Sequence, residues 1–106
     1  ERYDQARDLF RKAIDMNPRE MSAYYQLGKI ALLSGKDLEK GLGYFQEYLK
    51  VEPKPNNPTW ADVHWRMGMI QEKLGDKEQA VSEYQKALKL NPEHKNAKDS
   101  LSKIQK

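Results

Sequence analysis

The sequence predicts an all-α fold, an αα-superhelix (solenoid) of stacked antiparallel helix hairpins. Three observations predict it: amphipathic runs of helical length recur, short glycine-containing turns join them in pairs, and the pattern repeats about every 34 residues. The clearest copy lies between Ala61 and His94, where two amphipathic runs flank the turn Leu74-Gly75-Asp76. A turn this short makes the two helices antiparallel.

The first two helices are predicted before residue 35. The first runs from Glu1 to Met16 and ends at Asn17-Pro18, because the residue before a proline is disfavoured in helical geometry. The second runs from Met21 to Ser34 and is broken by Gly35. Because apolar residues recur on one face of each run, both helices are expected to bury a stripe.

The next two helices flank a proline-rich segment. The third is predicted from Leu38 to Val51, and the segment Glu52–Pro58, which includes the insertion Pro53–Pro58, is expected to form neither helix nor strand. Thr59 is a candidate N-cap for the fourth helix, with Asp62 three residues later, in the manner of a capping box.

The last two helices flank Pro92. The fifth helix is predicted over about Lys77–Leu90, and a final helix over about His94–Gln105. The final helix has few apolar side chains, so its outer face is expected to be polar, as in a capping helix.

The prolines that end the helix pairs set the period. Pro18 and Pro53 are 35 residues apart, and Pro53 and Pro92 are 39 apart. Both distances fit 34 residues if one residue is inserted in the turn Gly35-Lys36-Asp37 and five around Asn56–Trp60. A single domain over 1–106 is therefore expected, with these parts: half-repeat 1–18, repeat 19–55, inserted linker 56–60, repeat 61–94 and capping helix 95–106.

This pattern resembles the tetratricopeptide repeat, a family whose repeats prefer Trp or Leu, Leu, Gly, Tyr, Ala, Phe or Tyr, Ala and Pro at eight positions. One repeat here has Tyr24, Leu27, Gly28, Ala31, Gly41, Phe45, Tyr48 and Pro53 at these positions, and the next has His64, Met67, Gly68, Gln71, Ala80, Tyr84, Ala87 and Pro92. The half-repeat contributes Ala6, Phe10, Ala13 and Pro18. About two and a half repeats plus a cap are implied. Gly28 and Gly68 are expected to allow close approach of the paired helices.

The resemblance implies a protein-interaction scaffold that binds a peptide or helix of a partner in a concave groove lined by the first helix of each repeat. The expected groove residues lie one position round the helix from the core stripe: Tyr25, Gln26, Lys29, Leu32, Leu33, Trp65, Arg66, Met69, Glu72, Lys73, Asn96, Asp99 and Lys103. Aromatic anchors beside Arg and Lys are typical of binding hot spots. The alternative is that Trp65 and Tyr25 pack between neighbouring repeats.

One subfamily of these domains holds a partner's C-terminal carboxylate with Lys and Asn. Here Tyr25 and Lys29 stand where that clamp has Lys and Asn, and Asp62 stands where it has Lys. Only Arg66 matches, so no clamp of this type is predicted.

Two other modes of association are considered. The first helix lacks a hairpin partner, so Tyr3, Phe10 and Ile14 could form an apolar patch for self-association, upstream sequence or a swapped helix. Nucleic-acid binding is a remote alternative. It is considered because the excess charge of +3 lies in residues 77–106, which contain seven lysines and four acids. Acids interrupt this run and no aromatics interleave with the lysines, which favours a solvated surface.

No catalytic, metal or cofactor site is predicted. The chain has no cysteine, no phosphate-binding loop and two histidines thirty residues apart. His64 is expected to pack in the core, His94 to be solvated at a helix start, and Glu78 and Glu83 to be exposed. No membrane span is expected, because 33% of the residues are charged. The compartment is not predicted, and a start at Glu1 within a helical pattern suggests a piece of a longer protein.

Overall fold

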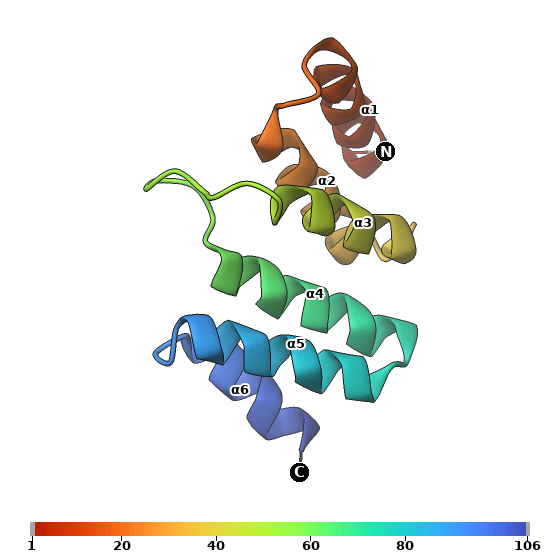
Figure 1. Ribbon diagram of the computed structural model, residues 1–106. Coiled ribbons are helices and arrows are strands. Elements are labelled where there is room, and N and C mark those ends of the chain that lie inside the picture. The colour runs from red at the N-terminus through yellow and green to blue at the C-terminus, as the bar shows by residue number, and fades with distance from the viewer. Residues whose placement is uncertain (1, 106) are drawn as a thin grey trace. The chain divides into compact units, whose positions relative to one another are not determined.

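Figure 1 shows the computed structural model, which describes residues 2–105; these residues form helices and no strand. The all-α fold class predicted from the sequence is confirmed. The helices are α1 (Arg2–Met16), α2 (Met21–Ser34), α3 (Leu38–Tyr48), α4 (Trp60–Leu74), α5 (Lys77–Leu90) and α6 (Lys95–Ile104).

The helix boundaries agree with the sequence except at α3. This helix ends at Tyr48 and not at Val51, because the backbone tightens before it reaches Pro53. The amide of Lys50 donates to the carbonyl of Glu47, and the amide of Val51 donates to the carbonyl of Tyr48. These hydrogen bonds join residues three apart, as in a 3₁₀-helix, and not four apart, as in an α-helix. The predicted start of the first helix, Glu1, lies outside the described residues.

The chain divides into two compact units, residues 1–52 and residues 53–106. Unit 1 holds α1, α2 and α3, and unit 2 holds α4, α5 and α6. The segment Pro53–Pro58 contains no helix, as the sequence predicts. The expectation of a single domain over 1–106 stays a prediction.

In unit 1, α2 packs against both α1 and α3. A Cβ atom added to Gly28 would lie 2.7 Å from the ring of Phe45, so only glycine allows this approach. The ring of Tyr25 meets that of Phe45 edge-on at a centroid distance of 5.7 Å and lies 5.5 Å from that of Tyr48. These aromatic side chains form much of the core of the α2–α3 hairpin.

Unit 2 repeats the same crossing between α4 and α5. A Cβ atom added to Gly68 would lie 2.5 Å from the ring of Tyr84. Tyr84 is fully buried between Ala80 and Ala87, which are fully buried as well. Gly28 and Gly68 therefore occupy equivalent crossings, as the 34-residue pattern predicts.

The turns inside the two hairpins are also equivalent. Gly35 ends α2 with φ 74° and Gly75 ends α4 with φ 86°, a left-handed conformation that favours glycine. Thr59 is the N-cap of α4, since its hydroxyl oxygen accepts from the amide of Asp62 at 3.2 Å. The predicted N-cap is confirmed.

Candidate functional site

Trp65 on α4 joins the three helices of unit 2. Its indole Nε1 donates to the hydroxyl of Ser100 on α6 at 3.1 Å. Its ring packs against a buried cluster of small residues from all three helices, Ala61, Ala87 and Ala97. The guanidinium of Arg66 lies 5.0 Å from the centroid of the Trp65 ring, a cation–π distance. Trp65 is therefore held in one orientation and is still partly exposed.

His94 anchors the first turn of α6. It is only 7% exposed, and its Nδ1 accepts from the amide of Ala97 at 3.1 Å, which makes it the N-cap of α6. Its Nε2 lies 2.6 Å from Oδ1 of Asp62 on α4. Because Nδ1 accepts, Nε2 carries the proton and donates to Asp62. The expectation that His94 is solvated is wrong, since both ring nitrogens are used inside unit 2.

A second histidine–carboxylate pair joins α4 to α5. Nδ1 of His64 lies 2.7 Å from Oε1 of Glu83, which is 6% exposed. His64 is packed inside the hairpin, as expected. The expectation that Glu83 is exposed is wrong, because the partly buried imidazole of His64 lies within hydrogen-bond distance of its carboxylate. Glu78 is exposed as expected.

Glu72 is an expected groove residue that forms an internal bond. The hydroxyl of Tyr84 on α5 donates to its carboxylate. Burial, and then the hydrogen bond and negative charge of Glu72, raise the pKa of Tyr84 well above its ordinary value. The hydroxyl of Tyr84 therefore stays protonated and ties α5 to the C-terminal half of α4.

The expected groove residues on α2 divide into core and surface. Tyr25 is 6% exposed and Leu32 is 1% exposed, so the expectation that they line an open groove is wrong. Tyr25 packs against the rings of Phe45 and Tyr48 within its own hairpin, whereas the alternative placed it between neighbouring repeats. Gln26 and Lys29 are partly buried, and Leu33 is exposed.

The expected groove residues in unit 2 are accessible to different degrees. Trp65, Arg66 and Met69 on α4 are partly buried, whereas Glu72 and Lys73 are exposed. On α6, Asn96, Asp99 and Lys103 are all exposed. The hydrogen bond between Trp65 and Ser100 joins α4 to α6 within this set of residues.

The first helix carries more exposed apolar surface than the sequence analysis identified. None of its described residues is buried. Tyr3 is exposed, and Phe10 and Ile14 are partly buried. Leu9 is 67% exposed and Met16 87% exposed, and neither was a predicted site residue. Their spacing from Ala6 and Ala13 on one helix face is the signal that could have identified them.

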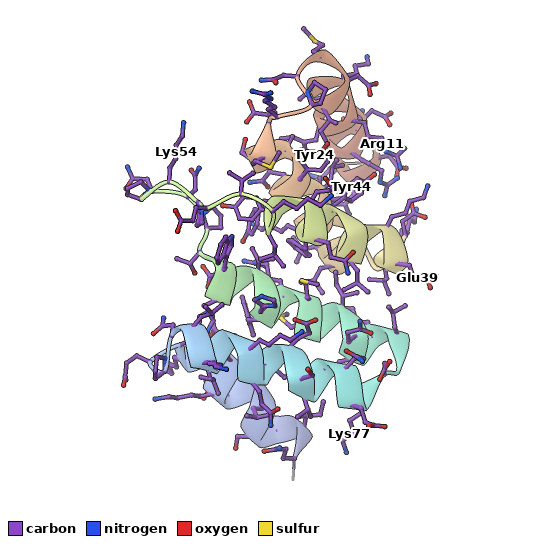
Figure 2. All side chains as sticks on the ribbon, in the orientation of Figure 1. Arg11, Tyr24, Glu39, Tyr44, Lys54 and Lys77 are labelled. Atoms are coloured by element: carbon purple, nitrogen blue, oxygen red, sulfur yellow. The ribbon has the colours of Figure 1, made fainter. Side chains whose placement is uncertain are left out.

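A small cavity of about 290 Å³ lies among the three helices of unit 1. Its lining includes Arg11 from α1, Tyr24 from α2 and Tyr44 from α3, whose side chains Figure 2 labels. A hydrogen bond to Tyr44 raises the pKa of Arg11 and outweighs the opposing effect of burial, with the charges of Asp37 and Asp8 adding to it. Because arginine is charged at all ordinary pH values, Arg11 places a positive charge at this cavity.

The lysines near the C-terminus are partly paired with acids. Lys98 lies 3.7 Å from Glu93, and Lys86 lies 4.0 Å from Glu83. Within residues 2–105 no group of three or more His, Asp and Glu side chains could hold a metal ion. In the same residues, no helix has the length and apolar character needed to cross a membrane.

Two family models of the tetratricopeptide repeat match the chain, one over residues 61–94 and the other over residues 1–58. The chain belongs to the tetratricopeptide repeat family. The repeats of this family stack into arrays that present extended binding surfaces. Apart from Trp60, the α4–α5 hairpin lies within the first of these matches, and α1, α2 and α3 lie within the second.

Relatives with these repeats are much longer proteins. The chain is 32% identical over 102 residues to Heat shock protein STI1 of Saccharomyces cerevisiae, covering 96% of this chain and 16% of that protein. It is 31% identical to Anaphase-promoting complex subunit 3 of Schizosaccharomyces pombe, covering 98% and 15%. It is 26% identical to the Mitochondrial import receptor subunit TOM70 of Rattus norvegicus, covering 85% and 14%. The chain thus spans only a small part of each of these relatives.

Proposed function

We propose that this chain is a protein-interaction module, and that a partner segment binds the α4–α6 face of unit 2. This face comprises Trp65, Arg66, Met69, Glu72, Lys73, Asn96, Asp99 and Lys103. Family membership supports the general role, as do relatives named as subunits of a complex and of an import receptor. Subunits of assemblies work in contact with other proteins.

The fixed indole of Trp65 is the observation that carries the proposal. Its hydrogen bond to Ser100 and the guanidinium of Arg66 over its ring hold it before any partner arrives. A side chain that is already ordered loses little conformational entropy on binding. Trp and Arg are also the residue types most enriched among binding hot spots.

The charges around Trp65 indicate the chemistry of the partner. The face has three cationic side chains and two acidic ones, so it carries both signs of charge: Arg66, Lys73 and Lys103 against Glu72 and Asp99. We therefore expect a peptide or helix with an apolar anchor and side chains of both charges, because complementary charge fixes the register of a bound segment. On α2, the exposed or partly exposed Gln26, Lys29 and Leu33 remain candidates for a separate contact.

Charge reversal on α6 tests this proposal. The double variant Asp99→Arg, Lys103→Glu keeps the net charge and changes two exposed residues. The matched control is Glu78→Arg, Lys89→Glu, which reverses one acid and one lysine at exposed positions of α5. Affinity capture with the full-length protein, quantified by mass spectrometry, should lose partner proteins with the α6 variant and retain them with the control.

The proposal fails if capture by the α6 variant is unchanged, or if the control loses the same proteins. Circular dichroism should show equal helix content in all variants, so that a loss of capture reports on the surface and not on folding.

A further inference from the structure

His94 caps α6 through a ring nitrogen that can take up a proton. Its Nδ1 accepts the hydrogen bond of the Ala97 amide at 3.1 Å, and Ala97 is fully buried. The usual N-cap residues are serine, threonine, aspartate and asparagine, whose side-chain oxygens accept this bond at neutral pH. An imidazole nitrogen accepts only in the neutral ring, because both nitrogens are donors in the protonated ring. The cap of α6 therefore depends on the charge of His94.

His94 also joins α6 to α4. Its Nε2 donates to Oδ1 of Asp62 at 2.6 Å, and its ring lies against the ring of Trp65 at a centroid distance of 5.7 Å. Trp65 makes a second bond between these helices, through the hydroxyl of Ser100. One imidazole thus supports the first turn of α6 and the contact of this turn with α4.

The charged side chains near His94 come from α4, from the turn before α6 and from α6 itself: Asp62, Arg66, Glu93, Lys95 and Lys98. Asp62 is the acid that bonds to the ring, and its side chain is 43% exposed. Glu93 instead pairs with Lys98 at 3.7 Å. On α5, the phenol of Tyr84 approaches Ser100 and keeps its proton at neutral and acidic pH, because burial raises its pKa.

Protonation of His94 removes more from the α6 contact than it adds. The buried amide of Ala97 loses its acceptor and faces a second donor. A cation is placed at a helix N-terminus, where the helix dipole disfavours positive charge, and the first turn of α6 has no acidic residue to offset it. The charge also lies on a ring that is only 7% exposed.

The compensating gains are smaller. The bond to Asp62 becomes charge-assisted, but solvent screens this carboxylate because it is partly exposed. The ring of Trp65 attracts cations, but the guanidinium of Arg66 already lies 5.0 Å from its centroid. The neutral form of His94 is therefore the form that holds α6 in place.

We propose that His94 is a pH-dependent switch whose protonation releases α6 from the α4–α5 hairpin. Release separates Ala97 from Ala61 and Ala87 and breaks the bond between the Trp65 indole and α6. The inference does not rest on the function proposed above, because it is measured on the chain alone.

The other histidine of the chain responds in the opposite sense. His64 faces the carboxylate of Glu83 at 2.7 Å, and Glu83 is 6% exposed. A positive charge on this ring strengthens its pairing with Glu83. The α4–α5 hairpin should therefore stay closed under the conditions that release α6.

Hydrogen exchange of the intact chain at about pH 7.5 and about pH 5.5 measures the release helix by helix, since histidine is the side chain that ordinarily changes its charge in this range. After correction for intrinsic exchange rates, the amides of residues 98–104 should lose roughly tenfold or more of their protection at the lower pH. The amides of residues 63–70 in α4 should lose much less. The indole N–H resonance of Trp65, assigned with Trp60→Phe, should shift over the same pH range.

Three variants separate the switch from a general effect of acid. His94→Asn keeps an N-cap acceptor that does not titrate, so α6 should have equal protection at both pH values. His64→Gln is the matched control, because it removes the other histidine, and it should keep the response of α6. Asp62→Asn keeps an acceptor for Nε2 but removes the charge that favours the protonated ring, so release should require a lower pH.

Several results would overturn the proposal. They are full protection of α6 at the lower pH, loss of protection in α4 by the same factor as in α6, an unaltered pH response in His94→Asn, and loss of the response in His64→Gln. An unmoved midpoint in Asp62→Asn would do the same. His94→Ser, which supplies another N-cap side chain, takes the place of His94→Asn if circular dichroism shows that His94→Asn does not fold.

Discussion

Gly28→Ala and Gly43→Ala should change the stability of unit 1 in opposite directions or by clearly different amounts. Both glycines lie inside helices of this unit, so alanine improves helix propensity at each by about 1 kcal/mol. The surroundings differ. A Cβ atom at Gly28 would lie 2.7 to 2.8 Å from three atoms of the buried Phe45 ring, whereas a Cβ atom at Gly43 meets nothing within 4 Å.

The difference between the two variants isolates the steric cost. Forcing an extra methyl group against a rigid, buried ring costs about 1–3 kcal/mol. Gly43→Ala should therefore raise the free energy of unfolding by about 1 kcal/mol. Gly28→Ala should change it by between zero and a loss of about 2 kcal/mol. Because the gain in helix propensity is common to both, the difference should be about 1–3 kcal/mol.

Urea denaturation followed by far-UV circular dichroism measures both variants under the same conditions. Equal stabilisation by the two substitutions would refute the reasoning, since it would show that Phe45 can move aside at no cost. Gly68→Ala, where Tyr84 is the neighbouring ring, provides an independent repetition in unit 2.

Three further predictions concern unit 2. Thr59→Ala should lower its free energy of unfolding by about 1 kcal/mol in urea denaturation, because the N-cap bond of α4 is lost; no change would show that water replaces the cap. His94→Ala should cost roughly 1–3 kcal/mol and alter the fluorescence of Trp65, because α6 loses its N-cap and its bond to α4. An unchanged spectrum would argue against that anchoring. Burial, followed by the bond to Glu72, raises the pKa of Tyr84 in the folded chain above its ordinary value of 10.0. The protonated hydroxyl therefore contributes fully to the free energy of unfolding below pH 10.0, and this contribution is lost as the pH rises further. The unaltered chain should therefore lose stability more steeply above pH 10.0 than Tyr84→Phe does, and parallel curves would contradict this.

The helices and their pairing could be predicted because their signals are local or periodic. Asn17-Pro18 and Gly35 end helices through backbone geometry alone, and the recurrence of Gly28 at Gly68 identifies the crossings. The end of α3 was predicted less accurately. The backbone leaves α-helical geometry after Tyr48, before the sequence reaches a residue that would prevent a further helical turn.

The environments of the polar side chains could not be predicted in the same way. His94 is buried because it meets Asp62, a residue 32 positions away on another helix. Glu83 is buried because it pairs with His64, and no residue close to Glu83 in the sequence indicates this pairing. Tyr25 contacts Phe45 and Tyr48, which lie on α3, beyond the turn that follows α2. The spacing of residues on α2 alone therefore predicted that Tyr25 is exposed. These errors share one cause, which is contact between residues distant in sequence.

The segment Pro53–Pro58, at the start of unit 2, offers a practical point of attachment. Asn56 is exposed and outside any helix, as is Lys54, which Figure 2 labels. The chain has no cysteine, so Asn56→Cys would introduce a unique thiol. A fluorophore, a spin label or a crosslinker could be coupled there without touching either hairpin, and a bound partner could be followed from that single position.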